Sequence, residues 1–247
     1  MFNLIRAHCF SLSRARTTWL LFAASVVCAL VMLLFLKRIG ASESSLGGIA
    51  FFFSDLNVVT LIGAVLATLL ISNDFDNRTM QHTISAGHSR AQIVTSKFIV
   101  YWLFMCLYLL PFVAASFWIF YADAPYTFGV PMGGMISAMN STTQISTAVA
   151  LLLSLIIVYV GQTSLAVMLA FFLKKPTFVI VLFYAISVLC GQLAANNLNW
   201  LNWTPFGGDA ITVTADSSLL AICLVSLRFI SICVGITILY FRKTDIH

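Results

Sequence analysis

The side chains able to do chemistry gather in one polar run, SNDFDNRTMQHTISAGHSRAQIVTSK, at residues 72–97. The run contains two Asp, two His, two Arg and one Lys. Histidine and carboxylate groups are common metal ligands, so Asp74, Asp76, His82 and His88 are the obvious candidate set. Their separations of two and six residues do not place them on one helical face. The spacing therefore does not favour a metal site, and another reason is needed for so much polarity in one place.

The rest of the chain is much more apolar than a soluble protein. Of 247 residues, 61% are hydrophobic and 9% are charged, and the mean hydropathy is +1.01. Soluble domains average about 45–50% apolar and about 25% charged residues. The composition predicts an integral membrane protein. The net charge of +5 does not indicate nucleic-acid binding, because the basic residues sit at the ends of apolar runs and form no basic face.

Six apolar runs are long enough to cross a bilayer, whose core of about 30 Å requires about 20 residues of helix. They are predicted at Thr18–Leu36, 49–72, Phe98–Tyr121, 148–173, Thr177–Ala195 and Leu219–Phe241. Helices are expected because unpaired backbone groups in hydrocarbon each cost several kcal/mol. The predicted fold class is all-α integral membrane, with one transmembrane domain over residues 1–247.

The basic residues set the expected orientation of these spans. With the N-terminus inside, only Lys37 and Arg38 flank the outer ends, and Arg228 lies within the sixth span. The cytoplasmic segments then hold Arg6, Arg14, Arg16, Arg78, Arg90, Lys97, Lys174, Lys175, Arg242 and Lys243. An excess of basic residues marks the cytoplasmic side. We therefore expect a multi-pass protein with both termini in the cytoplasm.

Two segments outside the spans have an amphipathic character. In residues 1–17, apolar side chains from Phe2 to Leu12 recur at spacings of three and four, which predicts an amphipathic helix in the inner headgroup plane. An unstructured basic tail is the alternative. Residues 196–218 form an outer loop with Trp200 and Trp203, whose rings favour the headgroup level. This loop is expected either to lie against the outer leaflet or to be an ordinary exposed loop.

The polar run itself has the signals of a short helix between the second and third spans. Asn77 is suited to cap a helix that ends at Ser85, with Gly87 just beyond it. Met80 and Ile84 would then share one face. Ser89 can cap a second helix that runs straight into the third span. The result would be a half-apolar cytoplasmic helix held by rigid spans on both sides. Such a helix is suited to mechanical coupling, because a partner that grips it moves both spans.

The order of residues in this run resembles the inner loop of type-2 ATP-binding-cassette exporter permeases. Those loops commonly carry an acidic–aromatic pair, then Gly-Thr, then a pattern close to L-S-x-G/P-x-S-R-x-x-I-x-x-S-K. The matches are Asp74-Phe75, Thr79, Ile84-Ser85, Gly87, Ser89-Arg90, Ile93 and Ser96-Lys97. Two positions depart from the pattern, since Asp74 stands where Glu is usual and Arg78 where Gly is usual.

The resemblance implies a permease subunit that is not an enzyme. Two such subunits, identical or diverged, would pair with two ATPase subunits that bind ATP and Mg²⁺ and act on a cytoplasmic coupling helix within residues 73–97. The sequence contains no G-x-x-x-x-G-K-[ST] phosphate loop, so ATP hydrolysis is expected in another polypeptide. The expected ATPase contacts are Asp74, Phe75, Arg78, Thr79, Met80, Ile84, Ser89 and Arg90. The alternative is a solvated turn whose basic residues simply follow the charge rule.

The resemblance also implies export across a cytoplasmic membrane, with a peptide or other amphipathic molecule as cargo and resistance to antimicrobial peptides as one setting. A non-transporting immunity or sensor protein, or a scaffold, is the alternative function. A membrane-embedded enzyme would need paired carboxylates, a Ser–His pair or zinc ligands inside the spans. The predicted spans contain one acid and no histidine, so this class is not favoured.

Asp55 and Arg228 are the ionisable residues within the predicted spans, and burial of each costs at least about 2.5–3.5 kcal/mol. At 1.5 Å per residue, Asp55 lies roughly 9 Å and Arg228 roughly 13 Å below the outer ends of their spans. We hypothesise that they form an ion pair or a polar patch lining an outer cavity. Alternatively, Arg228 extends towards the headgroups and Asp55 lies at the interface.

Overall fold

The computed structural model describes residues 2–39, 53–76, 79–121, 134–196, 199–211, 213–214 and 218–243. Every regular element within these ranges is a helix, and six helical rods are long and apolar enough to cross a membrane. The rods are α2 (Arg16–Ile39), α4 (Asp55–Ala67) continued by a π-helical turn (Thr68–Ser72) and α5 (Asn73–Asp76), α7 (Arg90–Tyr121), α9 (Ile145–Leu173), α10 (Pro176–Ala195) and α12 (Leu219–Lys243). Within the described residues, the predicted all-α class is confirmed, and so is the presence of six helices long and apolar enough to span a membrane.

Two of the rods begin elsewhere than predicted. The second starts at Asp55, while residues 49–52 lie outside the described ranges. The third rod starts at Arg90, eight residues before the predicted apolar span, because the helix expected after Ser89 continues without a break into that span. Pro111 lies inside α7 without ending it. A membrane helix tolerates proline where neighbouring groups satisfy the freed carbonyl.

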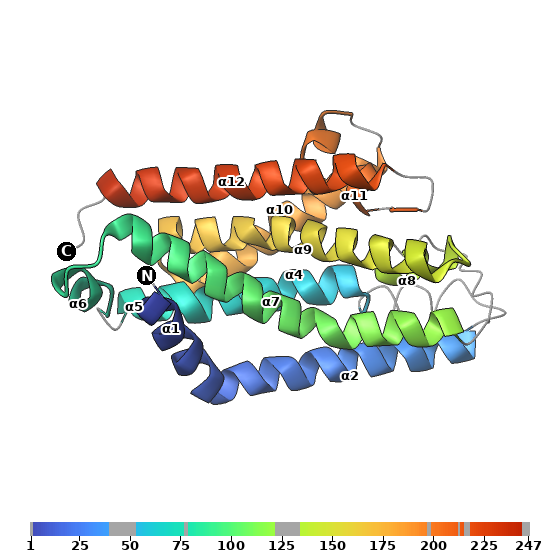
Figure 1. Cartoon of the computed structure of the whole chain (residues 1–247), viewed down its shortest axis with the longest axis horizontal. Coiled ribbons are helices and arrows are strands. Elements are labelled where there is room, and N and C mark those ends of the chain that lie inside the picture. Colours follow the sequence, from blue (N-terminus) through green and yellow to red (C-terminus); the bar gives the residue numbers. More distant parts are fainter. Residues whose placement is uncertain are drawn as a thin grey trace.

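Short helices gather at both ends of the bundle (Figure 1). One end, called the terminal end here, holds α1 (Phe2–Arg14), α6 (Thr79–Ser85) and the last turn of α12. The opposite end, called the distal end, holds α8 (Met135–Asn140) and the first turn of α12, with the 3-10 turn Asn199–Trp203 and α11 (Gly208–Ile211) beside it. The first and last described residues therefore share one end, as an even number of spans requires.

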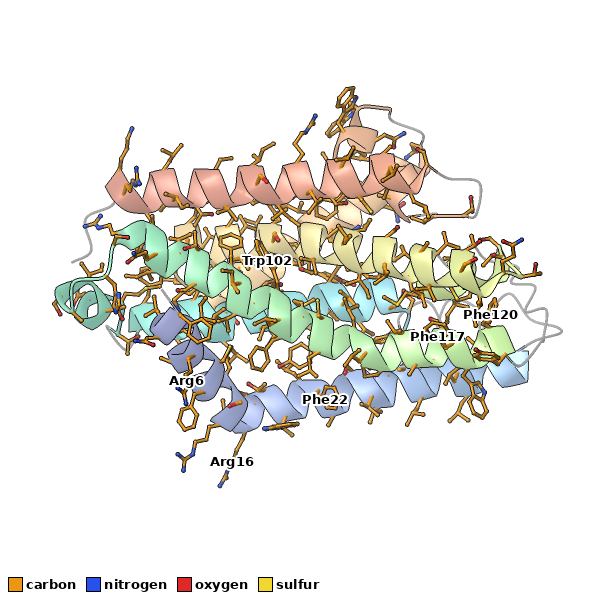
Figure 2. All side chains as sticks on the ribbon, viewed as in Figure 1. Arg6, Arg16, Phe22, Trp102, Phe117 and Phe120 are labelled. Atoms are coloured by element: carbon orange, nitrogen blue, oxygen red, sulfur yellow. The ribbon has the colours of Figure 1, made fainter. Side chains whose placement is uncertain are left out.

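Helix α9 lies at the centre of the bundle and packs against α4, α7, α8, α10 and α12. Trp102 of α7 points towards it and donates its indole N–H to the Ser164 hydroxyl (3.0 Å; Figure 2). The α4 rod is mostly buried, whereas α2, α10 and α12 present most of their surface outward. Outward apolar surface is expected of helices that face lipid, since lipid tails are as apolar as the side chains.

Two sharp reversals at the terminal end connect the rods. Lys174 ends α9 in the left-handed conformation (φ +58°), and Pro176 begins α10. Proline suits a first helical position because the missing N–H has no partner there in any case. Gly87 follows α6 with φ +88°, and its N–H donates to the Ile84 carbonyl (3.0 Å). The predicted position of this glycine beyond the helix end is therefore correct.

Candidate functional site

The segment between the second and third rods forms α6, from Thr79 to Ser85. The predicted cap Asn77 and the predicted contact Arg78 lie outside the described residues. Ser89 caps α7 as expected, because its hydroxyl accepts the Gln92 N–H (3.3 Å) and the Gln92 side chain accepts the Ser89 N–H (3.2 Å). This reciprocal pair is a capping box. Helix α6 is therefore joined to α7 by a short turn that ends in a defined cap.

Phe75, in α5 at the end of the second rod, attaches the chain just before α6 to the rest of the bundle. Its ring lies 6.2 Å from that of Phe171 in α9 and 6.4 Å from that of Phe241 in α12, both edge-to-face. The rings of Phe171 and Phe241 lie 5.4 Å apart, so the three form a closed triangle. Lys174 places its ammonium 5.4 Å from the centre of the Phe75 ring. Aromatic pairs of this kind each stabilise by about 0.5–1.5 kcal/mol beyond area burial.

A buried ion pair connects α5, at the end of the second rod, to α7. The Lys97 ammonium donates to the Asp74 carboxylate and to the Leu70 carbonyl (2.5 Å) in the π-helical turn. The Lys97 side chain has no solvent exposure, whereas that of Asp74 is 28% exposed. Buried charges require a partner of this kind, because an uncompensated charge is strongly destabilising. From the sequence, Lys97 was expected only as one of the basic residues on the cytoplasmic side, and the structure turns its side chain inward.

Arg90 connects the start of α7 to the end of α12. Its guanidinium donates to the carbonyls of Phe241 (3.0 Å) and Arg242 (3.1 Å) and lies 6.0 Å from the Phe241 ring centre. The last carbonyls of a helix have no partner within the helix and carry the negative end of its dipole. Arg90 therefore caps α12 from outside, so movement of α7 at this point acts on α12 as well.

The remaining predicted contacts divide between an inner and an outer face of α6. Met80 is 1% exposed and packs into the core, and Ile84 is half-buried against it. Thr79 and Ser89 are exposed, and the Thr79 hydroxyl donates to the Asp74 carbonyl (3.2 Å). Met80 is buried within this chain, and its contact with an ATPase stays a prediction. Its physical role is to hold α6 against the bundle.

Helix α1 contributes a buried histidine to the same region. The His8 Nε2 atom is buried and has no hydrogen-bond partner among the described residues. Burial and the nearby Lys97 charge lower the pKa of His8 to about 4, with the Asp74 carboxylate acting in the opposite direction. Arg6 and Arg16 are exposed on the outer sides of α1 and α2 (Figure 2). Helix α1 therefore packs a neutral histidine inward and presents arginines outward.

Asp55 forms a separate polar centre at the start of α4, which begins well inside the distal ends of α7 and α9 (Figure 1). Its carboxylate accepts the Tyr159 hydroxyl (2.6 Å) and the Met135 N–H (2.7 Å), and the residue is 2% exposed. Gly134, at φ +105°, presses against this carboxylate so closely that a Cβ atom would overlap it. Asp55 thereby fastens α8 into the core of the bundle.

Arg228 does not join Asp55, so the hypothesised pair is not formed. Its guanidinium lies 5.3 Å from the Trp203 ring centre and makes a long contact of 3.5 Å to the Trp203 carbonyl. Asp55 points towards α8 and α9, whereas Arg228 is exposed on α12, which packs against the other side of α9. Similar depths along two helices do not bring residues together when a third helix stands between them.

The inward positions of several residues of these centres carried no signal in the sequence. Lys97 was one of the expected cytoplasmic bases, His8 was a histidine outside the predicted spans, and Tyr159 was one aromatic residue in a continuous apolar span. Their roles depend on which face of each helix turns inward. Within the described part of the chain, no three His, Cys, Asp or Glu side chains gather as metal ligands, and the side chains of Asp76 and His82 lie outside that part.

No protein-family model matches this sequence, and no curated protein matches it either.

Proposed function

We propose that this chain is the membrane-spanning permease subunit of an ATP-driven exporter, acting through an ATPase that docks on α6. The observation that supports this most directly is the attachment of α5, which packs against α6, to three rods. Phe75 of α5 contacts α9 and α12, Asp74 of α5 pairs with Lys97 of α7, and Arg90 connects α7 to α12. A force on α6 is therefore transmitted to much of the bundle.

The exposure of α6 suits a docking element. Thr79, Ser85 and Ser89 are exposed, while Met80 is buried beneath them. A partner would touch the polar face, and the apolar face would carry the movement inward. Packed interiors transmit displacement because they have low compressibility. The order of residues in this loop, which resembles that of type-2 ATP-binding-cassette exporters, agrees with this arrangement.

The remaining parts of the proposal follow from the same resemblance. Two permease subunits and two ATPase subunits would assemble in the cytoplasmic membrane, with the terminal end and both termini in the cytoplasm. ATP and Mg²⁺ would bind the ATPase, and the cargo would be a peptide or another amphipathic molecule. The exposed Arg6 and Arg16 on α1 and α2 suit the headgroup plane of that leaflet.

The test is site-specific cross-linking to the ATPase that we expect to co-purify with this chain. In a background without native cysteines, Ser85→Cys places a thiol on α6, and Thr143→Cys places an exposed one at the distal end as a control. We expect cross-links at residue 85 that change with ATP, none at residue 143, and faster ATP hydrolysis when the full chain is present. A folded chain that gives neither cross-link nor stimulation contradicts the proposal and favours an immunity, sensor or scaffold protein.

A further inference from the structure

The surface formed by Arg228, Trp203 and the exposed face of α12 is unusual for a membrane helix. Leu224, Leu227 and Ile232 are exposed around Arg228 and make that face apolar. Arg228 lies nine residues after the first residue of α12, about 13 Å along the helix. A guanidinium on a lipid-facing surface at this depth requires an anion or a route to water.

The described residues make few contacts with this guanidinium. Arginine carries five N–H donors in a planar fork, and the described contacts are one 3.5 Å contact to the Trp203 carbonyl and the face of the Trp203 ring. The ion pair of Lys97 and Asp74 lies at the other end of the bundle. Among the described residues, the exposed Arg228 guanidinium has no carboxylate partner, and most of its donors are not used by them.

The neighbouring turn indicates the level at which the charge lies. Trp200 and Trp203 are 59% and 65% exposed, and both belong to the 3-10 turn Asn199–Trp203. Exposed indoles favour the boundary between headgroups and acyl chains. Because the Arg228 side chain reaches this turn, its guanidinium lies where lipid phosphates are found, although its Cα lies deeper.

We propose that Arg228 and Trp203 form a binding site for the phosphate of an anionic phospholipid in the leaflet at the distal end of the bundle. The fork of arginine donors matches the oxygens of a phosphate. An anionic headgroup neutralises the guanidinium, whereas a zwitterionic headgroup carries no net charge to do so. The acyl chains would lie along Leu224, Leu227 and Ile232. The proposal does not depend on the proposed transport function.

The experiment measures quenching of Trp203 fluorescence by brominated phosphatidylglycerol in phosphatidylcholine vesicles that contain the full chain. The contribution of Trp203 is the part of the signal that is lost in the Trp203→Phe variant. We expect brominated phosphatidylglycerol to quench it at a concentration roughly tenfold lower than brominated phosphatidylcholine does, as a charge-assisted contact implies. Arg228→Gln should remove this preference, and Arg228→Lys should retain part of it.

The matched control is Arg242→Gln, which removes the same charge from the opposite end of α12 and should leave the preference unchanged. Inorganic phosphate should not compete, since the site takes its phosphate from a membrane lipid. Equal quenching by the two lipids in the wild-type chain overturns the proposal, as does an unchanged preference in Arg228→Gln. The proposal is also overturned if the wild-type chain shows no preference and Asp209→Asn or Asp216→Asn creates one. The replaced aspartate would then be the counter-ion of Arg228.

Discussion

Lys97 of α7 donates to the Asp74 carboxylate of α5, and the lysine is entirely enclosed while the aspartate is 28% exposed. This difference in exposure makes the loss of one partner more costly than the loss of the other. Loss of the lysine leaves a carboxylate that water can reach. Loss of the carboxylate leaves an ammonium that water cannot reach, with the Leu70 carbonyl as its remaining partner.

We therefore expect Asp74→Asn to lower the free energy of unfolding by about 3–5 kcal/mol, because it leaves a buried charge uncompensated. Lys97→Met should lower it by only about 1–2 kcal/mol, because Asp74 can be hydrated. Titration with sodium dodecyl sulfate in mixed micelles measures both, and Lys175→Met serves as the control. A larger loss for Lys97→Met than for Asp74→Asn would contradict this order.

Gly134 should tolerate no side chain. Gly134→Ala forces a Cβ atom into the Asp55 carboxylate and strains a residue at φ +105°. Backbone strain alone costs about 1–3 kcal/mol, and we expect at least this loss in the free energy of unfolding. Gly191→Ala is the matched control, because a Cβ atom there would meet no other atom within 4 Å and the residue lies inside α10. Gly191→Ala should raise the free energy of unfolding by up to about 1 kcal/mol. Equal changes in this free energy at the two glycines would refute the prediction.

Removal of the Arg90 side chain should loosen the end of α12. Arg90→Ala leaves the Phe241 and Arg242 carbonyls without their external cap, which is worth about 1 kcal/mol. Amide hydrogen exchange in the last turn of α12 should become roughly five- to tenfold faster. Exchange in the middle of α9 provides the internal reference. The same exchange rate in both proteins at the end of α12 would show that Arg90 is not a cap.

Docking of α1 should weaken in mild acid. His8 has a pKa of about 4 when α1 is packed, below its ordinary value of 6.5, because burial and Lys97 oppose its charged form. The packed state thus binds fewer protons than the detached state, so packing is strongest above about pH 6.5 and weakens as the pH falls towards 4. Below pH 4 this contribution no longer changes.

Hydrogen exchange of the α1 backbone, corrected for the intrinsic effect of pH, measures this docking. His8→Gln cannot titrate and should give an exchange profile that is flat over the same interval. Asp74 also faces this region and is present in both proteins, so the difference between the two profiles isolates the histidine. An identical pH response in His8→Gln would assign the effect to another group.

The number of spans and most of their bounds could be predicted from the sequence, because length and hydropathy are properties of a segment by itself. Gly87 and the Ser89 cap were equally predictable, since a helix end depends on the residues that adjoin it. The interfacial role of α1 and the coupling role of α6 stay predictions. Both helices are present in the structure.

The partners of Lys97, Asp55 and Arg228 were decided only by the tertiary structure. Depth along a helix follows from counting residues, and by depth alone Asp55 and Arg228 are able to meet. The direction in which each side chain points depends on how the helix is rotated against its neighbours. In a soluble protein the apolar stripe reveals that rotation. Here lipid-facing and core-facing surfaces are both apolar, so only packing around α9 determined which charges turned inward and which turned to the membrane.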